Sequence, residues 1–363
     1  MASVTITDVA KRAGVSMKTV SRVLNAEPHV RDELKARVLA AAQDLHYRPK
    51  VSARSLAGAR SYVIGCLLPT RFLQTRAFPY LVQAQLGALS ACRVAGYHLL
   101  VDTVDQSAKD VGAEIEALAN ALAVDGLILL PPLCDDHKVL DALDREGIAY
   151  VRIAPATRLN RSARVDVDDR GGARVITEHL LELGHRRIGF VEGPAGHSAS
   201  VRRLQGFRDA MAARGAPVDE GLLRPGLFNF QSGHEAAGSM LALKSPPTAI
   251  FASNDQMAFG VMARAHELGL RMPEALSVAG FDDVPAASMM AWPSLTTMRQ
   301  PIERMTALAA ETIISWTAKT SAPRSRAPPP FECELVVRGS TAPPADRRPA
   351  ESRAGARTSR KRR

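Results

Sequence analysis

Residues 5–25 read TITDVAKRAGVSMKTVSRVLN, and this stretch decides the fold of the N-terminal part of the chain. Apolar residues recur at helical spacing on both sides of Gly14. Thr5 and Asp8 form a [ST]-x-x-[DE] capping box for a first helix, and Ser16 can cap a second one. Gly14 lies where a helix ends in the left-handed conformation, because glycine has no Cβ to clash. The pattern predicts two short helices joined by a tight turn.

This arrangement is typical of a helix-turn-helix, in which the second helix enters the major groove of DNA. The start of that helix faces the base edges. An ordinary helical hairpin with a solvated outer face is the alternative. The side chains expected on the outer side of the second helix are Met17, Lys18, Ser21 and Arg22.

Residues 10–25 match the string A-x-x-A-G-V-S-x-x-T-V-S-R-V-L-N, which resembles the start of the LacI/GalR family of transcription regulators. The resemblance implies a regulator rather than an enzyme, and a homodimer on a near-palindromic operator. Base contacts are expected from one set of side chains and phosphate contacts from another. The bases are read by Met17, Lys18 and Arg22, and the phosphates are bound by Thr5, Ser16, Thr19, Ser21 and Asn25.

A third helix is expected over residues 32–45, which completes a DNA-binding domain of residues 1–47. Arg31 precedes it, where the family usually has Ser or Thr as a cap. Residues 48–60 resemble the family's hinge segment, in which Ala53 and Leu56 are expected to contact DNA. Leu56 corresponds to the leucine that wedges between base pairs in the minor groove and bends the duplex. A plain interdomain linker is the alternative.

Composition fits a small nucleic-acid module joined to a different kind of domain. The 363 residues carry a net charge of +10, and two or three domains are expected for that length. Residues 1–60 carry +6 and residues 346–363 another +6, whereas the long middle is near −2. The four cysteines form no C-x-x-C pair, so neither a metal site nor a cofactor is expected. Without a signal peptide or a long apolar run, the protein is expected in the cytoplasm, with no membrane partner.

From Tyr62 onward, short apolar runs alternate with helical stretches, which predicts an α/β fold with parallel sheets. The family resemblance implies the architecture: two Rossmann-like lobes of the periplasmic-binding-protein type. In that architecture the chain passes from one lobe to the other three times. The crossings are expected near residues 160, 292 and 322. The first lobe then comprises residues 61–160 and 293–321, the second 161–292 and 322–340, and residues 341–363 form a disordered basic tail.

Polar residues follow the strands expected in the second lobe, where parallel sheets bind ligands. The segments around Asn254 and Asp282 resemble the family's A-N-D and V-x-G-F-D-D motifs, Arg203 corresponds to an arginine that reaches the cleft, and Phe228 corresponds to a pocket aromatic. Asp and Arg can take paired hydroxyls, Asn can donate and accept, and an aromatic ring can cover a sugar face. The alternative roles are helix capping for Asp282 and core packing for Phe228. In the first lobe, Arg71 or Tyr80 is expected to contribute.

We therefore expect a repressor of a sugar-catabolic operon that responds to a small sugar or glycoside. Many family members have an Asp after the strand at 149–153, where this chain reads Arg152-Ile153-Ala154-Pro155, so a simple hexose is less expected. A purine- or other metabolite-responsive regulator is the main alternative, and a sugar-binding protein without a DNA role is a weaker one. A dehydrogenase is disfavoured, because no G-x-G-x-x-G follows a first strand. His185 is expected to be a loop residue before a strand.

Overall fold

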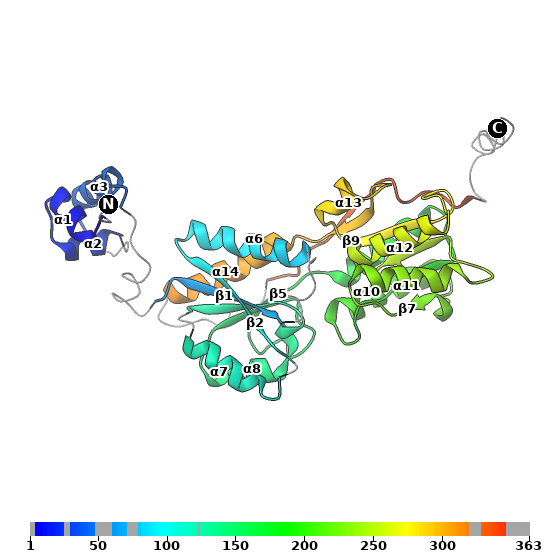
Figure 1. Cartoon of the computed structure of the whole chain (residues 1–363), viewed down its shortest axis with the longest axis horizontal. Coiled ribbons are helices and arrows are strands. Elements are labelled where there is room, and N and C mark those ends of the chain that lie inside the picture. Colours follow the sequence, from blue (N-terminus) through cyan, green and yellow to red (C-terminus); the bar gives the residue numbers. More distant parts are fainter. Residues whose placement is uncertain are drawn as a thin grey trace.

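The computed structural model describes residues 4–24, 30–47, 60–70, 79–106, 108–121, 124–318 and 328–345 (Figure 1). Some of the predictions above fall outside these ranges: Asn25, residues 48–59 of the hinge segment with Ala53 and Leu56, Arg71, the crossing near residue 322, and residues 346–363 of the expected tail.

The N-terminal headpiece has three helices: α1 (Ile6–Ala13), α2 (Met17–Leu24) and α3 (Asp32–Asp44). The predicted caps are confirmed. The amide of Thr5 donates to Asp8 Oδ2 at 2.9 Å, and the hydrogen bonds from Thr5 lower the pKa of Asp8. Gly14 ends α1 with φ +63°, and Ser16 Oγ accepts from the amide of Thr19 at 3.1 Å. The turn between α1 and α2 therefore follows from local chemistry.

The third helix closes the headpiece core. Val9 and Val20 are fully buried against Val38 of α3. Arg31 at the start of α3 makes no side-chain cap, as the sequence predicted, whereas Arg37 Nη2 donates to the carbonyl of Ala13 at 2.5 Å. This hydrogen bond satisfies an otherwise free carbonyl at the end of α1.

The first lobe has a five-stranded parallel sheet in the order β2-β1-β3-β4-β5, with helices on both faces. Helices α6 and α14 cover one face of this sheet, and α7 and α8 cover the other. Figure 1 shows the two pairs above and below the sheet. The elements are β1 (Val63–Pro69), α6 (Pro79–Val94), β2 (His98–Val104), α7 (Val111–Ala121), β3 (Gly126–Leu129), α8 (His137–Arg145), β4 (Tyr150–Ile153), β5 (Ala163–Val165) and α14 (Ile302–Ala318).

The second lobe has a six-stranded sheet in the order β11-β10-β9-β8-β6-β7, parallel except for β11. Helices α9 and α10 cover one face, and α11 and α12 cover the other. The elements are α9 (Asp169–Glu182), β6 (Ile188–Val191), α10 (Ser198–Ala213), β7 (Leu223–Arg224), α11 (Phe230–Leu241), β8 (Ala249–Ala252), α12 (Asp255–Glu267), β9 (Ser277–Asp282), α13 (Pro285–Met289), β10 (Thr296–Arg299) and β11 (Glu334–Val336).

Two predicted crossing points were placed too early. Residues 163–165 form β5, which pairs with β4 in the first lobe, so the chain crosses after Val165 rather than near 160. Residues 296–299 form β10, which pairs with β9, so the return crossing follows Arg299 rather than residue 292. Both strands are short and lack a continuous apolar run, so their pairing partners, rather than their own sequence, decide their place.

His185 lies between α9 and β6 as expected, but it is only 1 % exposed. Its Nδ1 is 2.8 Å from Thr248 Oγ1, and its Nε2 is 2.9 Å from the carbonyl of Ala342 and 3.1 Å from Ser277 Oγ. The ring therefore ties Ala342 to the base of the second sheet. The expectation of a disordered tail from residue 341 is wrong for Thr341 and Ala342, because both make hydrogen bonds with the second lobe. Burial lowers the pKa of His185 to about 4.

This depressed pKa predicts a loss of stability in acid. Above pH 6.5 the ring is neutral in both states, whereas from pH 6.5 down to about 4 only the unfolded chain takes up the proton. The free energy of unfolding should therefore fall by about 2–3 kcal/mol more in the wild type than in His185→Gln over this interval. Urea unfolding of both proteins at several pH values measures this difference in the free energy of unfolding. The exposed His98→Gln is the control, and identical pH profiles for wild type and His185→Gln would contradict the assignment.

Candidate functional site

A cavity of about 380 Å³ lies between the two lobes, at the carboxyl ends of the parallel strands. Residues from both lobes line it, so any molecule bound there touches both. The first lobe contributes Tyr80, Leu81, Pro131, Pro132 and Ala154. The other lining residues are Val167, Asp169, Pro194, His197, Ser198, Ala199, Arg203, Leu227, Phe228, Asn229, Asn254, Asp282 and Gln300. The four predicted effector contacts, Arg203, Phe228, Asn254 and Asp282, are thus brought together around one cavity.

Arg203 on α10 is 4 % exposed and makes its hydrogen bonds inside the protein. Its Nε and Nη2 each lie 2.8 Å from Asp169 Oδ1, and its Nη1 donates to the carbonyl of Ser253 at 2.6 Å. Nη1 is also 3.5 Å from Asp282 Oδ1. The guanidinium lies over the ring of Phe281, 3.8 Å from its centroid. Arg203 therefore holds the polar groups of the cavity wall in place.

Asp282 ends β9 and faces the cavity rather than capping a helix. Its Oδ1 accepts from Gln300 Nε2 at 2.6 Å, and its backbone has φ +119°. Such a φ is uncommon outside glycine and persists only where the surroundings enforce it, as is often the case at binding sites. Burial raises the pKa of Asp282 to about 6, although Arg203 and Gln300 counteract that rise. The neighbouring Asp283 is instead paired with Arg299 and Arg338.

Asn254 and Phe228 are coupled to each other. Asn254 Oδ1 caps α12 by accepting from the amide of Met257 at 3.0 Å, while its Nδ2 donates to the carbonyl of Phe228 at 3.1 Å. Phe228 has φ +57°, and its ring meets His197 edge-on with centroids 5.1 Å apart. A Cβ on Gly193 would lie 2.3 Å from Phe228 Cζ, so the ring needs glycine there. Phe228 therefore lines the cavity and also packs against the core of the second lobe.

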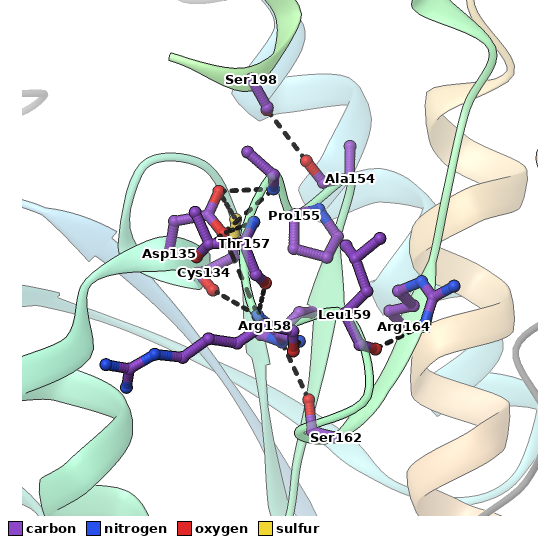
Figure 2. A network of polar contacts seen from close by, with 12 residues as sticks. Cys134, Asp135, Ala154, Pro155, Thr157, Arg158, Leu159, Ser162, Arg164 and Ser198 are labelled. Carbon is purple, nitrogen blue, oxygen red and sulfur yellow. Dashed lines mark hydrogen bonds and ion pairs between the residues drawn. The ribbon is translucent and has the colours of Figure 1, made fainter. Parts of the chain in front are cut away.

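Arg152 lies at the end of β4, near the place where many family members have an Asp, but it is not among the residues that line the cavity. The side chain is fully buried and points into the loop after β4, where it donates to the carbonyls of Thr157 and Arg158 at 2.9 and 2.6 Å. It also donates to Ser162 Oγ at 3.0 Å and to the carbonyl of Cys134 at 3.3 Å. Figure 2 shows the loop folded around these contacts, with the Asp135 carboxylate accepting from the amides of residues 156 and 157.

The same loop touches the second lobe. Ser198 Oγ, at the start of α10, donates to the carbonyl of Ala154 at 2.9 Å (Figure 2). Arg202 Nη2 donates to the carbonyl of Pro155 at 2.7 Å. Ala154 and Ser198 both line the cavity. These two hydrogen bonds therefore join the lobes directly beside the binding cavity.

Sequence reasoning missed several cavity residues, among them Asp169, His197 and Gln300. Asp169 follows β5 and Gln300 follows β10, so the rule that polar residues follow strand ends would have found both had these short strands been predicted. Of the two first-lobe candidates, Tyr80 lines the cavity, and burial raises the pKa of its hydroxyl.

On the headpiece, the start of α2 is open to solvent. Met17 is 53 % exposed, and Ser16 and Lys18 are exposed as well. Thr19, Ser21 and Arg22 are half-buried on the same helix, and Thr5 is exposed at the start of α1. Thr7 Oγ1 lies 3.3 Å from Met17 Sδ, which orients the methionine toward α1. The face has the size and polarity that a major groove accepts.

Within the described ranges, no helix is long and apolar enough to cross a bilayer. Those ranges also contain no group of three or more His, Cys, Asp or Glu side chains placed to hold a metal ion.

Comparison with known proteins agrees with both parts of the molecule. Residues 5–50 match the family described as bacterial regulatory proteins, lacI family, and residues 177–341 match a periplasmic binding protein-like domain. The chain is 32% identical over 338 residues to the probable HTH-type transcriptional repressor ExuR of Bacillus subtilis (strain 168), covering 93% of this chain and 98% of the relative. It is 36% identical over 316 residues to the repressor PurR of Edwardsiella ictaluri (strain 93-146), covering 85% and 89%.

Solved structures are similar over nearly the whole chain. The complex of the transcriptional regulator CelR with cellobiose has a TM-score of 0.69 at 32% identity, over 93% of this chain and 99% of that one. The lac repressor dimer bound to operator and the anti-inducer ONPF has a TM-score of 0.73 at 28% identity, over 94% and 100%.

The Arg203 cluster predicts a large cost for removing its cation. Arg203→Met leaves the buried Asp169 and Asp282 without their counter-ion, so the free energy of unfolding should fall by about 3–5 kcal/mol at pH 7.5. Without the cation the pKa of Asp282 lies above its wild-type value of about 6, so the loss should shrink as the pH falls from 7.5 toward 6 and change little through this group below that. Arg170→Met, which breaks the exposed pair with Asp209, is the matched control and should cost about 1 kcal/mol or less. Equal losses in urea unfolding of the two variants would contradict this account.

Proposed function

Because the chain belongs to the LacI family of bacterial transcription regulators, we propose that it represses a sugar-catabolic operon and that a small sugar or glycoside in the interlobe cavity controls its binding to the operator. One observation carries the proposal: the same chain has an exposed helix suited to the major groove and a separate cavity lined with hydroxyl-binding side chains. Repression of an operon requires access to bacterial DNA, so we place the protein in the cytoplasm.

In this proposal α2 reads the operator. Lys18 and Arg22 suit guanine O6 and N7, and Met17 offers an apolar contact to a thymine methyl group. Thr5, Ser16, Thr19, Ser21 and Asn25 position the helix on phosphates, and the hinge residues Ala53 and Leu56 contact the minor groove. In this proposal residues 48–60 are the hinge and the first lobe begins at residue 61, with the crossings between lobes moved to follow β5 and β10.

The cavity supports a sugar for two reasons. It is lined both by polar side chains and by the ring of Phe228, which suits a molecule with hydroxyls at its edge and a C–H face. The similar regulator CelR was solved with cellobiose. A purine-responsive regulator is the second candidate, because the chain is also 36% identical to a repressor named PurR and an aromatic face can stack on a purine.

A second copy of the chain is proposed to dock on an apolar strip that spans both lobes. Val82, Leu86 and Leu89 are exposed on α6, and Met289 and Trp292 are exposed in and after α13, where Trp292 is 93 % accessible. Figure 1 shows α6 and α13 along the same, upper side of the two lobes. Large exposed apolar side chains gathered in this way are typical of protein interfaces. The lac repressor structure is also described as a dimer on its operator.

The function is tested by fluorescence anisotropy of the purified protein on a labelled duplex from its own upstream region. We expect tight binding that a mono- or disaccharide or a plant glycoside weakens. Arg22→Ala should lower operator affinity by about 1–3 kcal/mol while binding to random DNA stays nearly unchanged, because a base contact is lost. The control is Arg271→Ala, which removes an equal charge from the surface of the second lobe.

Three outcomes would change the proposal. Equal losses on operator and random DNA would show that Arg22 contacts phosphate only. Tightening of the complex by a purine would replace the sugar with a purine corepressor. Absence of any preference for the upstream duplex would contradict the repressor role.

The apolar strip predicts a variant that separates dimers. Trp292→Glu puts a charge at the most exposed aromatic side chain of the apolar strip. The variant should therefore run as a monomer in size exclusion with light scattering at micromolar concentration. Operator affinity should fall with it, since two headpieces must bind together. Leu268→Glu, at an exposed leucine after α12, is the control and should stay dimeric. A dimeric Trp292→Glu would contradict this interface.

A further inference from the structure

Asp169 has the features of a ligand-binding residue, although neither the family motifs nor the comparisons point to it. It starts α9, lines the interlobe cavity and is 1 % exposed. Both close contacts from Arg203 go to its Oδ1. Its Oδ2 is buried and, among the described residues, has no hydrogen-bond partner. A carboxylate oxygen left in this state is costly unless a donor arrives.

The hydrogen-bond donors of the cavity wall are largely used within the protein. Arg203 donates to Asp169, to the carbonyl of Ser253 and to Asp282. Gln300 Nε2 also donates to Asp282, which leaves that carboxylate with two internal donors on one oxygen.

Two further polar side chains of the lining, Asn254 and Ser198, follow the same pattern. Asn254 Nδ2 donates to the carbonyl of Phe228, and Ser198 Oγ donates to the carbonyl of Ala154. Arg203, Gln300, Asn254 and Ser198 therefore direct donors to acceptors within the protein, and the part of the second-lobe wall around Asp169 and Asp282 offers mainly carboxylate oxygens. A ligand that fits this wall must bring hydrogen-bond donors of its own.

The charges of the wall favour the same kind of ligand. Asp169 and Asp282 face a single buried cation, Arg203, and that cation contacts both of them. A carboxylate or phosphate on the ligand would meet two carboxylates in a desolvated place, where like charges repel strongly. Hydroxyl or ammonium groups would instead give charge-assisted hydrogen bonds to the same oxygens.

We propose that Asp169 binds the effector directly, and that Asp169 and Asp282 together select an uncharged or amine-bearing sugar and reject sugar acids and sugar phosphates. The inference rests on the proposed function and narrows its ligand class. Arg203 is then a positioning residue that orients the two carboxylates. Asp169 also supplies, from the start of α9, the hydroxyl-binding carboxylate that the end of β4 lacks.

The experiment compares matched ligands on the full-length wild-type protein. Melting temperature is measured with glucose, glucosamine, glucuronate and glucose 6-phosphate, with galactose and galacturonate, with cellobiose and cellobionate, and with hypoxanthine and guanine. Calorimetry then gives the affinity of each compound that raises the melting temperature. We expect binding by a neutral or amino sugar and none by its acid or phosphate counterpart.

The best ligand is then titrated into Asp169→Asn, which keeps an oxygen for Arg203 but replaces the unpartnered acceptor with a donor. Affinity should fall about ten- to hundredfold, the usual effect of losing a hydrogen bond to a charged group. The melting temperature of the unliganded variant should stay close to that of the wild type. Asp209→Asn, a matched change on the exposed face of α10, should leave affinity unchanged.

The outcomes separate the inference from the function on which it rests. Tighter binding by glucuronate, galacturonate, cellobionate or glucose 6-phosphate than by the neutral sugar would overturn the inference and leave a sugar-responsive regulator. Equal sugar affinity in the wild type and Asp169→Asn would do the same. Binding by a purine alone would overturn the sugar proposal, and the Asp169→Asn comparison on that purine would decide the role of Asp169. Binding by no compound of the panel would contradict both.

Discussion

The buried guanidinium of Arg203 is the interaction on which the cavity depends. It joins the first turn of α9, the end of β8 and the end of β9 through Asp169, the carbonyl of Ser253 and Asp282. These three elements meet at one edge of the second sheet because parallel strands present their carboxyl ends together. Without a cation there, two desolvated carboxylates would repel each other, and the edge would not hold one geometry. The cluster thus contributes order to the cavity more than net stability.

A second buried arginine organises the opposite wall by different means. Arg152 makes its hydrogen bonds mainly to backbone carbonyls, and its Nη1 also lies 4.0 Å from Asp135 Oδ1, so it fixes the path of the loop after β4 and pairs with one carboxylate. The result is a wall that offers Ala154 and prolines to the cavity and two carbonyls to α10. Most of the polar side chains that line the cavity thus belong to the second lobe, whereas the first lobe contributes mainly apolar residues and the contact between lobes.

The difference between what the sequence predicts and what it misses follows from the range of the interactions. The headpiece is readable because Thr5, Asp8, Gly14 and Ser16 act on neighbours within three residues. The long buried strands are readable because their apolar runs are continuous. In contrast, β5 and β10 are short segments whose place is set by β4 and β9. Because these two strands were not predicted, Asp169 and Gln300, which follow them, were not predicted as cavity residues either. The internal use of Arg203 could not be read either, because its partners are 34 and 79 residues away in the chain.

The contacts between lobes show how a ligand can act at a distance. An effector can shift the lobe arrangement only by binding its two forms with different affinity, and typical coupling energies are about 1–3 kcal/mol. The hydrogen bonds from Ser198 to Ala154 and from Arg202 to Pro155 are of that order of energy and border the same cavity. A ligand that touches Ala154 on one side and Asp169 on the other therefore needs to strengthen or weaken only one or two such bonds to change the lobe equilibrium. The hinge and headpiece attach to the first lobe, so a change of that size at the cavity is enough to alter how two headpieces meet their operator.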